Sequence, residues 1–431
     1  MSISLNNIRP VKFRITAGLI GISLFLLTAS RLSVAAEMSF SGFATLGLTY
    51  EGHNELAYRN TLINAVHDGV SFPADSVLGG QVNVEFNDHW EAVGQIVIQD
   101  RADTAFSNYI EKAFVRYNVD RNLAIRVGRM DSNLFMLSDY RQVGYAYPWA
   151  RPPIDFYSAS SIIASIEGID VYYSFDVLGG FMKAGMLVGE TQARLNGDSG
   201  RLRVDFKDAV ATIVEFQKGY WLLKIAHAVG ETDNFEFVGF EEFRDAFDFV
   251  PEVLWPEASS VIDGIDPDGD RVSYTSLGLK YDDFTWQVQA EAAYFNSDWT
   301  LYPAATFGYL SIGRYFDRFL PYVSVSGYRP DDPVTRINAP QLPPNIPAEL
   351  AFTINALATL GDGATTDAYV DQTTLTVGLR WDFADAWALK FQADHVRIKE
   401  FGSGLWGNDA LATFSQPQTL NVIHLGVSTV F

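Results

Sequence analysis

Apolar and polar residues alternate along most of the chain, in segments of about a dozen residues. The last segment has one apolar face and one small or polar face. The apolar face consists of Ile423, Leu425, Val427, Thr429 and Phe431, and the opposite face of His424, Gly426 and Ser428. Side chains of a strand alternate between its two faces. The pattern therefore predicts a strand with lipid on one side and water on the other.

Two kinds of connection join the alternating segments. The short connections are Asn87-Asp88-His89, Asp120-Arg121-Asn122, 176–180, Lys218-Gly219, Asp282-Asp283, Asp317-Arg318 and Ala384-Asp385. The long connections are 51–74, 130–165, 231–271, 330–369 and 401–418. A soluble sandwich also alternates, but only a barrel explains a tight turn at every second connection. We predict an all-β, antiparallel transmembrane barrel of about 16 strands, with short periplasmic turns and long outer loops.

Residues 1–36 have the pattern of a secretory signal. Arg9, Lys12 and Arg14 precede the apolar run 17–27, and Val34-Ala35-Ala36 offers small residues for cleavage. The run is shorter than the roughly 20 apolar residues that a spanning helix needs. We expect cleavage after Ala36 and a mature barrel domain over residues 37–431.

Composition narrows the class of protein. Aromatic residues make up 14% of the chain, which suits girdles at the two membrane interfaces. Cysteine is absent, so no disulfide and no thiolate metal site is expected. The signal removes four of the 31 basic residues, and 27 bases against 52 acids leave a net charge of −25. Nucleic-acid binding needs clustered bases and is excluded at this charge.

The third outer connection, 130–165, is apolar and aromatic without a strand pattern. It follows the segments 110–117 and 124–129. Together with the signal, the strand number and the terminal Phe431, it resembles the porin superfamily of Gram-negative outer membranes. The resemblance implies a third loop folded into the lumen, and an outer-membrane location among lipid and lipopolysaccharide. It also implies a homotrimer, and recognition of Phe431 by the barrel-insertion machinery. The second connection, Ala102–Ser107, is shorter than in trimeric porins.

If the third loop narrows the lumen, charged residues of the loop and its flanking strands form a pore constriction. The acids are Asp131, Asp139 and Asp155, the loop bases are Arg141 and Arg151, and the wall bases are Lys112, Arg116, Arg126 and Arg129. Opposed charges across a wet lumen sort ions. Alternatively, Asp131, Arg141 and Arg151 pair with each other and fix the loop. The loop aromatics either form a stacking path for solutes or pack against the wall.

Metal and catalytic motifs are weak. Acids cluster between Asp263 and Asp270, but Leu277 stands where an EF-hand has its glutamate, so a cation site or a solvated turn both remain open. The histidines form no zinc motif, and no Gly-x-Ser-x-Gly elbow occurs. His395 and Asp394 are adjacent and point to opposite faces of a strand. We expect no cofactor, no metal and no enzyme activity.

The favoured interpretation is a porin for passive diffusion of ions and small hydrophilic solutes. One alternative is a substrate-specific channel for sugars, aromatic acids or phosphate. An outer-membrane hydrolase and a structural adhesin are alternatives of other classes.

Overall fold

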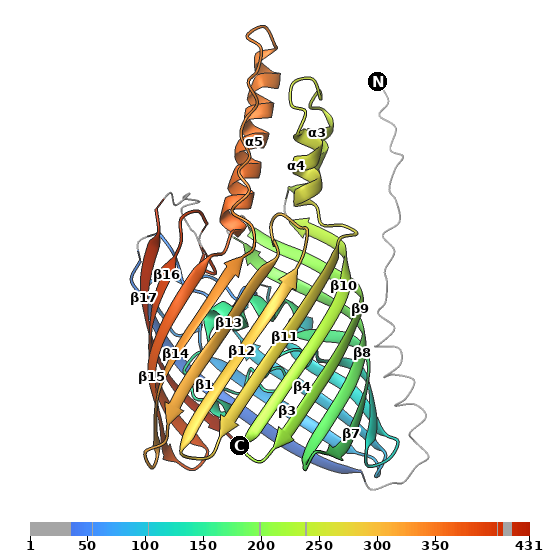
Figure 1. The fold of residues 1–431 in the computed structure, drawn as a ribbon, viewed down its shortest axis with the longest axis vertical. Coiled ribbons are helices and arrows are strands. Elements are labelled where there is room, and N and C mark those ends of the chain that lie inside the picture. The colour runs from blue at the N-terminus through green and yellow to red at the C-terminus, as the bar shows by residue number, and fades with distance from the viewer. Residues whose placement is uncertain are drawn as a thin grey trace, which may run out of the picture.

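The computed structural model describes residues 36–53, 55–101, 103–197, 200–237, 239–402, 404–407 and 416–431. The predicted signal thus lies outside the described residues except for Ala36. Within the described residues, sixteen long strands form one antiparallel sheet (Figure 1). The first strand pairs with the last, from Phe43↔Val430 to Glu51↔Val422, and this pairing closes the sheet into a barrel. The predicted barrel and its strand number are confirmed.

The strands follow one another around the barrel in chain order. They are β1 (Glu37–Glu51), β3 (Val77–Glu85), β4 (Trp90–Gln99), β5 (Ile110–Asn118), β6 (Leu123–Asp131), β7 (Ser165–Val177), β8 (Gly180–Gly197), β9 (Gly200–Lys218), β10 (Trp221–Phe237), β11 (Arg271–Asp282), β12 (Trp286–Asn296), β13 (Ala305–Arg314), β14 (Phe319–Pro330), β15 (Gln372–Ala384), β16 (Trp387–Ile398) and β17 (Gln418–Val430). The two-residue strand β2 (Val70–Ser71) belongs to the first outer connection, which we call loop 1 (52–76). All seven predicted tight turns lie between the expected pairs of strands.

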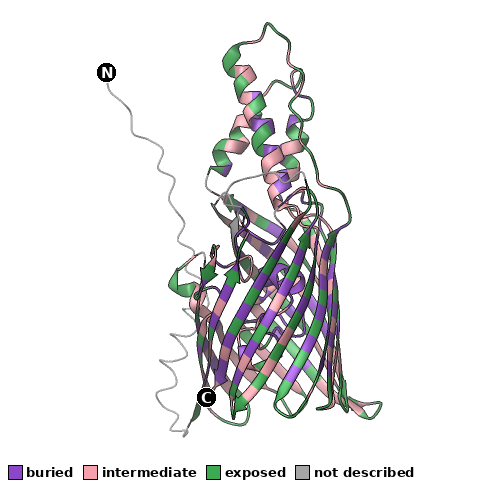
Figure 2. Ribbon diagram, turned by 90° about the vertical axis from the view of Figure 1, so that its left-hand side faces the viewer, coloured by how far each residue is buried: buried purple, intermediate pink, exposed green. Residues whose placement is uncertain are grey.

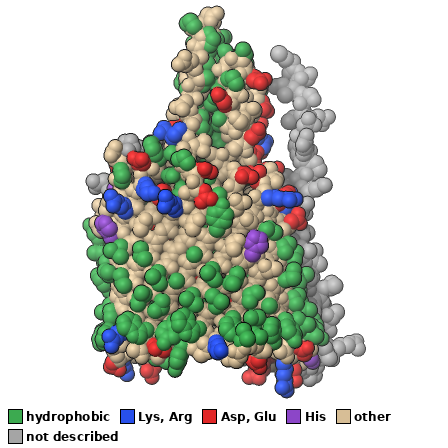
Figure 3. All heavy atoms as spheres, viewed as in Figure 1, with side chains coloured by type: hydrophobic (Ala, Val, Ile, Leu, Met, Phe, Trp, Pro, Cys, Tyr) green, Lys and Arg blue, Asp and Glu red, His purple; other side chains and the backbone are tan. Residues whose placement is uncertain are grey.

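The two faces of the wall differ as the alternation predicts. On β15, Leu375, Val377 and Leu379 are turned outward, whereas Thr374 and Thr376 are buried on the inner side. Buried and exposed residues alternate along the strands in Figure 2. On the face of the barrel that Figure 3 shows, hydrophobic side chains form a band across the lower part, and charged side chains lie below and above this band. An apolar band around a closed barrel is the surface of a barrel that spans a membrane.

Aromatic side chains gather where the strands meet the short turns. These outward residues include Trp90, Trp221, Trp286, Phe319, Trp381 and Trp387. Phe319 stacks on Trp381 with ring centroids 5.7 Å apart. The chain ends at the same level, where the amide of Phe431 donates to the carbonyl of Gly42 at 2.9 Å. A girdle of this kind marks the periplasmic membrane interface.

Helices rise above the opposite end of the barrel, and we call them the tower (Figure 1). They are α3 (Phe240–Asp248), α4 (Ala258–Ile265) and α5 (Ala348–Ala368). Trp255, Ile262, Ile354 and Leu357 form their shared core. Residues 239–270 carry ten acids and one base, and residues 331–371 carry six acids and one base. Much of the net negative charge therefore lies outside the lumen.

The sequence predicted these segments as long irregular loops. The proline-rich part 331–347 is irregular in the structure, whereas 240–248, 258–265 and 348–368 are helical. None of the helices in the described part of the chain is long and apolar enough to span a membrane.

Candidate functional site

The third outer connection, loop 3 (132–164), folds into the lumen, as the resemblance implied. Phe135, Leu137, Trp149 and Phe156 are all nearly inaccessible to solvent. We divide the loop, with the last residue of β6, into a charged stretch (131–143) and an aromatic stretch (144–160). The two stretches are fixed to the wall by different kinds of contact.

The aromatic stretch packs against the inner faces of β12 to β15. The indole of Trp149 donates to Ser311 Oγ at 2.9 Å, and its ring meets Tyr309 edge-on, with centroids 5.7 Å apart. Helix α2 (Ile154–Ser160) continues the stretch, and Tyr157 contacts the hydroxyl of Tyr309 at 3.0 Å. Of the two interpretations of the loop aromatics, packing against the wall is what Tyr147, Trp149 and Tyr157 do.

Asp155 belongs to this packed region. It is fully buried on α2 and accepts hydrogen bonds from Ser326 and from Gln372, the latter at 2.7 Å. Burial raises the pKa of Asp155, and the hydrogen bonds of these neutral groups offset part of that effect. Its position is that of a residue that anchors the loop.

Two cations of the wall hold the backbone of the aromatic stretch. The ammonium of Lys390 donates to the carbonyls of Tyr147 and Trp149 at 2.7 and 2.8 Å, and also to that of Gly144. Arg380 donates to the carbonyls of Tyr145 and Tyr147 at 2.7 and 3.1 Å. These bonds satisfy carbonyl groups that would otherwise be buried without partners.

The charged stretch crosses the lumen to β5. Asp131 forms an ion pair with Lys112 at 2.5 Å, and Arg141 pairs with Glu111 at 3.2 Å. Lys112 also donates to the carbonyl of Asp139 at 2.9 Å. The alternative that Asp131, Arg141 and Arg151 pair with each other is wrong, because each has a partner on the wall or on loop 1.

A β-bulge makes the crossing possible. Gln95 pairs with Lys112 and Ile96 with Ile110, so Glu111 is an extra residue on β5. An extra residue interrupts the alternation. Glu111 and Lys112 therefore both point inward, although they are adjacent in the sequence.

Asp139 differs from the other charged residues of the loop, because its side chain is exposed to the lumen. Its carboxylate has no hydrogen bond or ion pair within the described residues. Enclosure in the lumen raises the pKa of Asp139, but Lys224, Lys112 and Lys183 outweigh it and hold the pKa below its usual value. A free acid on the loop thus faces bases on the wall.

The three other expected wall bases have acidic partners. Arg116 meets Glu91 at 2.6 Å, and Arg126 forms a two-pronged pair with the buried Asp170 at 2.5 to 3.0 Å. Both arginines face the lumen.

Arg129 lies on the outward face, two residues beyond the exposed Val127, where its Nε donates to Glu167 at 2.9 Å. The structure therefore does not bring Arg129 together with the other residues of the site.

Where loop 3 crosses the lumen, its residue Arg151 contacts loop 1. Arg151 donates to the carbonyls of Arg59 and Asn60, the former at 2.8 Å, and lies over the ring of Tyr58. Asp75 of loop 1 accepts from Tyr58 at 2.7 Å. These contacts fold loop 1 into the lumen beside loop 3.

His424 connects loop 1 to the wall. Its two ring nitrogens lie 2.9 Å from Asp75 and 3.2 Å from Asp394. Burial raises the pKa of Asp75, but the hydrogen bond and charge of His424, with Arg151 and Thr49, lower it to about 2. Sequence reasoning considered His395 beside Asp394 and missed this arrangement, because Asp75 and His424 are 349 residues apart.

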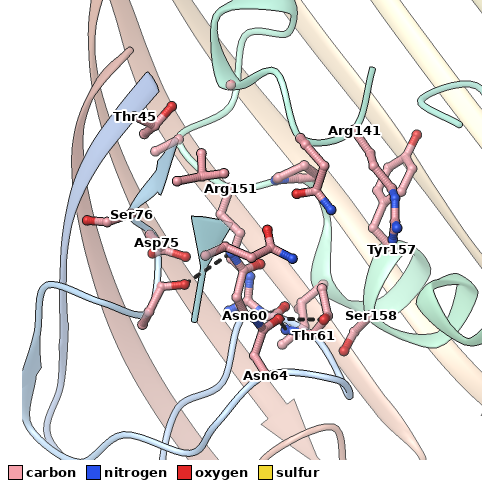
Figure 4. Close-up of a pocket in the computed structure, with 18 of the residues that line it drawn as sticks. Thr45, Asn60, Thr61, Asn64, Asp75, Ser76, Arg141, Arg151, Tyr157 and Ser158 are labelled. Atoms are coloured by element: carbon pink, nitrogen blue, oxygen red, sulfur yellow. Dashed lines mark hydrogen bonds between the residues drawn. The ribbon is translucent and has the colours of Figure 1, made fainter. Parts of the chain in front are cut away.

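Two cavities flank the crossing. The first has a volume of about 80 Å³ and lies between loop 1, β1 and loop 3. In Figure 4, Asp75 and Ser76 lie on one side of it and Arg141 and Tyr157 on the other. The second has a volume of about 220 Å³ at the periplasmic end. Its polar and charged lining comprises Arg116, Asn118, Asp120, Arg121, Asn122, Arg126, Tyr172, Ser174 and Lys183.

Several charged residues of the lumen were not identified from the sequence. They are Glu91, Asp170, Lys183, Glu215, Lys224, Glu291, Arg380 and Lys390. The alternation carried a signal for most of them, because Lys183, Lys224 and Lys390 each lie on the face opposite to outward apolar neighbours.

The acidic cluster 263–270 is part of the tower. Asp263 belongs to α4, and the turn after it is closed by hydrogen bonds from Thr232 to the carbonyls of Pro267 and Asp270. Among the described residues, no group of three or more potential metal ligands occurs there or elsewhere.

Comparison with known proteins identifies the fold. No protein family model and no curated protein matches the chain. The outer membrane channel DcaP of Acinetobacter baumannii superposes with a TM-score of 0.52 at 14% identity, over 93% of this chain and 99% of that one. OmpF of Salmonella typhi, in complex with daunomycin, gives a TM-score of 0.51 at 11% identity, over 93% and 99%. The chain therefore has the fold of the porins of the Gram-negative outer membrane.

Proposed function

We propose that the protein is a water-filled channel for passive diffusion of ions and small hydrophilic solutes across the outer membrane. The observation that carries the proposal is the crossing of loop 3, where polar and charged side chains line a cavity on each side. Charged groups such as Asp139 and Lys183 are stable at this depth only beside water. A lumen closed by packing would present apolar groups at these positions.

The charges at the crossing support ion sorting. Asp139 on the loop faces Lys112, Lys183 and Lys224 on the wall. Opposite charges on two sides of a narrow path create a transverse field, which orients polar solutes and sorts ions by charge. The acids of the tower lie outside this path, so the net charge of the chain does not decide the selectivity.

Single-channel recording in planar bilayers under a salt gradient tests the proposal. We expect stepwise ohmic openings from the purified mature protein. Asp139→Asn should shift the reversal potential toward anions and Lys183→Gln toward cations. Each should change the permeability ratio about two- to fivefold, since a unit charge near an ion in water contributes on the order of 1 kcal/mol.

Asp385→Asn in a periplasmic turn is the matched control and should leave the ratio unchanged. A folded barrel without conductance would contradict the channel. Conductance that saturates with a sugar, an aromatic acid or phosphate would instead favour the substrate-specific alternative.

We also propose a homotrimer. Apolar side chains of loop 1 and of the short helix η2 (Phe106–Tyr109) are exposed at the outer ends of neighbouring strands. They are Val70, Phe72 and Phe106, exposed by 61%, 57% and 70%. A partner subunit would remove them from water. Native mass spectrometry of the wild type in mild detergent should give three times the mass of the mature chain. The double variant Phe72→Ser/Phe106→Ser should give the mass of the monomer. A monomeric wild type would contradict the proposal.

A further inference from the structure

Residues 55–68 of loop 1 form a small hairpin inside the barrel, which we call the plug. Tyr58 and His67 exchange backbone hydrogen bonds at 2.8 and 2.6 Å. The hairpin returns to the wall beside the point where it leaves it, because the amide of Glu51 donates to the carbonyl of Gly69 at 2.9 Å. The plug is therefore a compact element with hydrogen bonds of its own, and its two ends lie close together.

The plug packs against an apolar patch of the inner wall. Leu56 and Tyr58 are 2% and 1% exposed, and they share a buried cluster with Ile154 of loop 3. The wall side of this cluster consists of Val396 and Ile398 on β16 and of Leu420 and Val422 on β17.

The inner faces of β16 and β17 change character where the plug begins. Closer to the periplasm, buried polar residues occupy the same inner rows, namely Gln392 and Asp394 on β16 and His424 and Ser428 on β17. A lumen wall in contact with water is polar. The apolar patch therefore indicates a wall that stays covered, since a plug that swung outward would expose four aliphatic side chains to water.

Polar contacts fix the plug on two sides. On the side of loop 3, Arg151 donates to two of its backbone carbonyls. On the side of β4, His67 Nε2 lies 2.8 Å from Asp100, and the amide of Asn64 donates to the carbonyl of Asp100. The plug thus occupies the sector of the lumen from β16 to the outer end of β4.

Three buried polar atoms beside the plug weigh against a fixed position. Glu51 Oε2, Arg151 Nη1 and Trp406 Nε1 have no hydrogen-bond partner among the residues that the structure describes, and such groups favour an arrangement that admits water. Arg151 lines the first cavity, whose volume is about 80 Å³. A water molecule needs about 10–15 Å³ of such space. Water can therefore enter beside the plug without displacing it.

We propose that the plug is a permanent second narrowing of the lumen, which sets the size of the largest solute that the channel admits. This inference rests on the channel proposed above. The aromatic stretch of loop 3 covers the wall from β12 to β15, and the plug covers the next sector. A solute can use only the space that the two elements leave, which includes the first cavity between Asn60 of the plug and Arg141 of loop 3 (Figure 4).

Single-channel conductance of the full-length mature barrel, measured with polyethylene glycols of increasing size as uncharged probes, tests the proposal. Replacing residues 55–68 by a Gly-Ser-Gly linker should raise the conductance about twofold and admit larger glycols, since the open cross-section of the barrel decides both. Recording at about 1 M salt limits the reach of charges to about 3 Å, so the lost charges of the plug do not imitate this effect.

A second variant tests the same point in a chain of unaltered length. Leu56→Asn/Tyr58→Asn places polar groups against the apolar patch and should produce intermittent openings to the larger conductance. Phe352→Asn/Leu360→Asn is the matched control, because these side chains are exposed on the tower by 75% and 60%, and it should conduct as the wild type does. Heat-modifiable migration on gels confirms the folding of each variant.

An unchanged conductance and an unchanged size limit in both plug variants would overturn the proposal. Frequent openings of the wild type to the larger conductance would also overturn it, because the plug would then be a gate. If the folded wild type does not conduct, the channel itself is contradicted, and the proposal on the plug with it.

Discussion

The two stretches of loop 3 occupy the same lumen and are held there by different means. The aromatic stretch is buried against β12 to β15 by ring packing and by hydrogen bonds such as that of Trp149 to Ser311, and its backbone carbonyls accept from Lys390 and Arg380. The charged stretch reaches β5 through ion pairs and leaves Asp139 exposed. Buried contacts of the aromatic stretch thus fix the backbone of the loop, and the charges of the other stretch remain free to face water.

The largest expected effect comes from breaking the anchor of the aromatic stretch. Lys390→Met keeps the volume but removes the ammonium group that three buried carbonyls share. We expect the free energy of unfolding to fall by about 3 kcal/mol, since each buried carbonyl without a donor costs about 1–3 kcal/mol and the lost charge offsets part of this. Urea unfolding in lipid vesicles, followed by tryptophan fluorescence, measures the change.

Lys280→Met is the matched control, because Lys280 also faces the lumen but has no partner within the described residues. The control should change the free energy of unfolding by less than about 0.5 kcal/mol. Similar losses in both variants would show that the carbonyl contacts of Lys390 do not anchor the loop.

A second prediction concerns loop 1, which faces both stretches across the first cavity. The ordinary pKa of an aspartate is 3.8, and the folded protein lowers that of Asp75 to about 2. A lowered pKa stabilises the folded state above about pH 4, and this contribution is lost as the pH falls through about 2. The free-energy difference between wild type and Asp75→Asn should therefore shrink by about 2 kcal/mol from pH 5 to pH 2.

The groups that face Asp75 are Thr49, Tyr58, Arg151 and His424, with Asp394 on the far side of His424. Urea midpoints of the two proteins over this pH range give the measurement. A difference that is constant with pH would mean that the contacts of Asp75 do not depend on its charge.

The smallest effect is expected for a single hydrogen bond within the aromatic stretch. Ser311→Ala removes the acceptor of the buried Trp149 indole and should cost about 1 kcal/mol of unfolding free energy. Ser324→Ala is the control, because the buried hydroxyl of Ser324 has no hydrogen-bond partner within the described residues. Equal costs would assign the effect to lost packing and not to the hydrogen bond.

The barrel was predictable because its signals are local. Alternation along 373–381 and the turn Ala384-Asp385 each lie within a few neighbouring residues, and together they specify faces and strand number. Helix α5 was not predictable in the same way. It contains Gly361 and Gly363 and no clear amphipathic period, and it is stabilised by packing against α3 and α4, which are distant in sequence.

The position of the site was predictable from the sequence, but the ion-pair and hydrogen-bond partners of its residues were not. The location of the charged stretch followed from the third loop. The partners did not, because Arg126–Asp170 depends on the register between β6 and β7, and Lys390–Trp149 depends on where the loop meets the inner face of β16. The bulge at Glu111 was hidden as well, since one additional residue in a strand leaves no mark on composition or spacing.

The tower concentrates acids above the barrel, whereas the crossing of loop 3 lies inside it, and the salt of the surrounding medium decides whether the two act together. At about 0.15 M salt the screening length is about 8 Å, so the electrostatic field of the tower's acids does not reach far beyond the surface of the tower. At about 0.01 M it extends about 30 Å, and the acids then enrich cations at the entrance and speed their arrival. The rate at which cations enter the barrel is therefore expected to depend on the salt concentration of the medium, and to be highest in dilute medium.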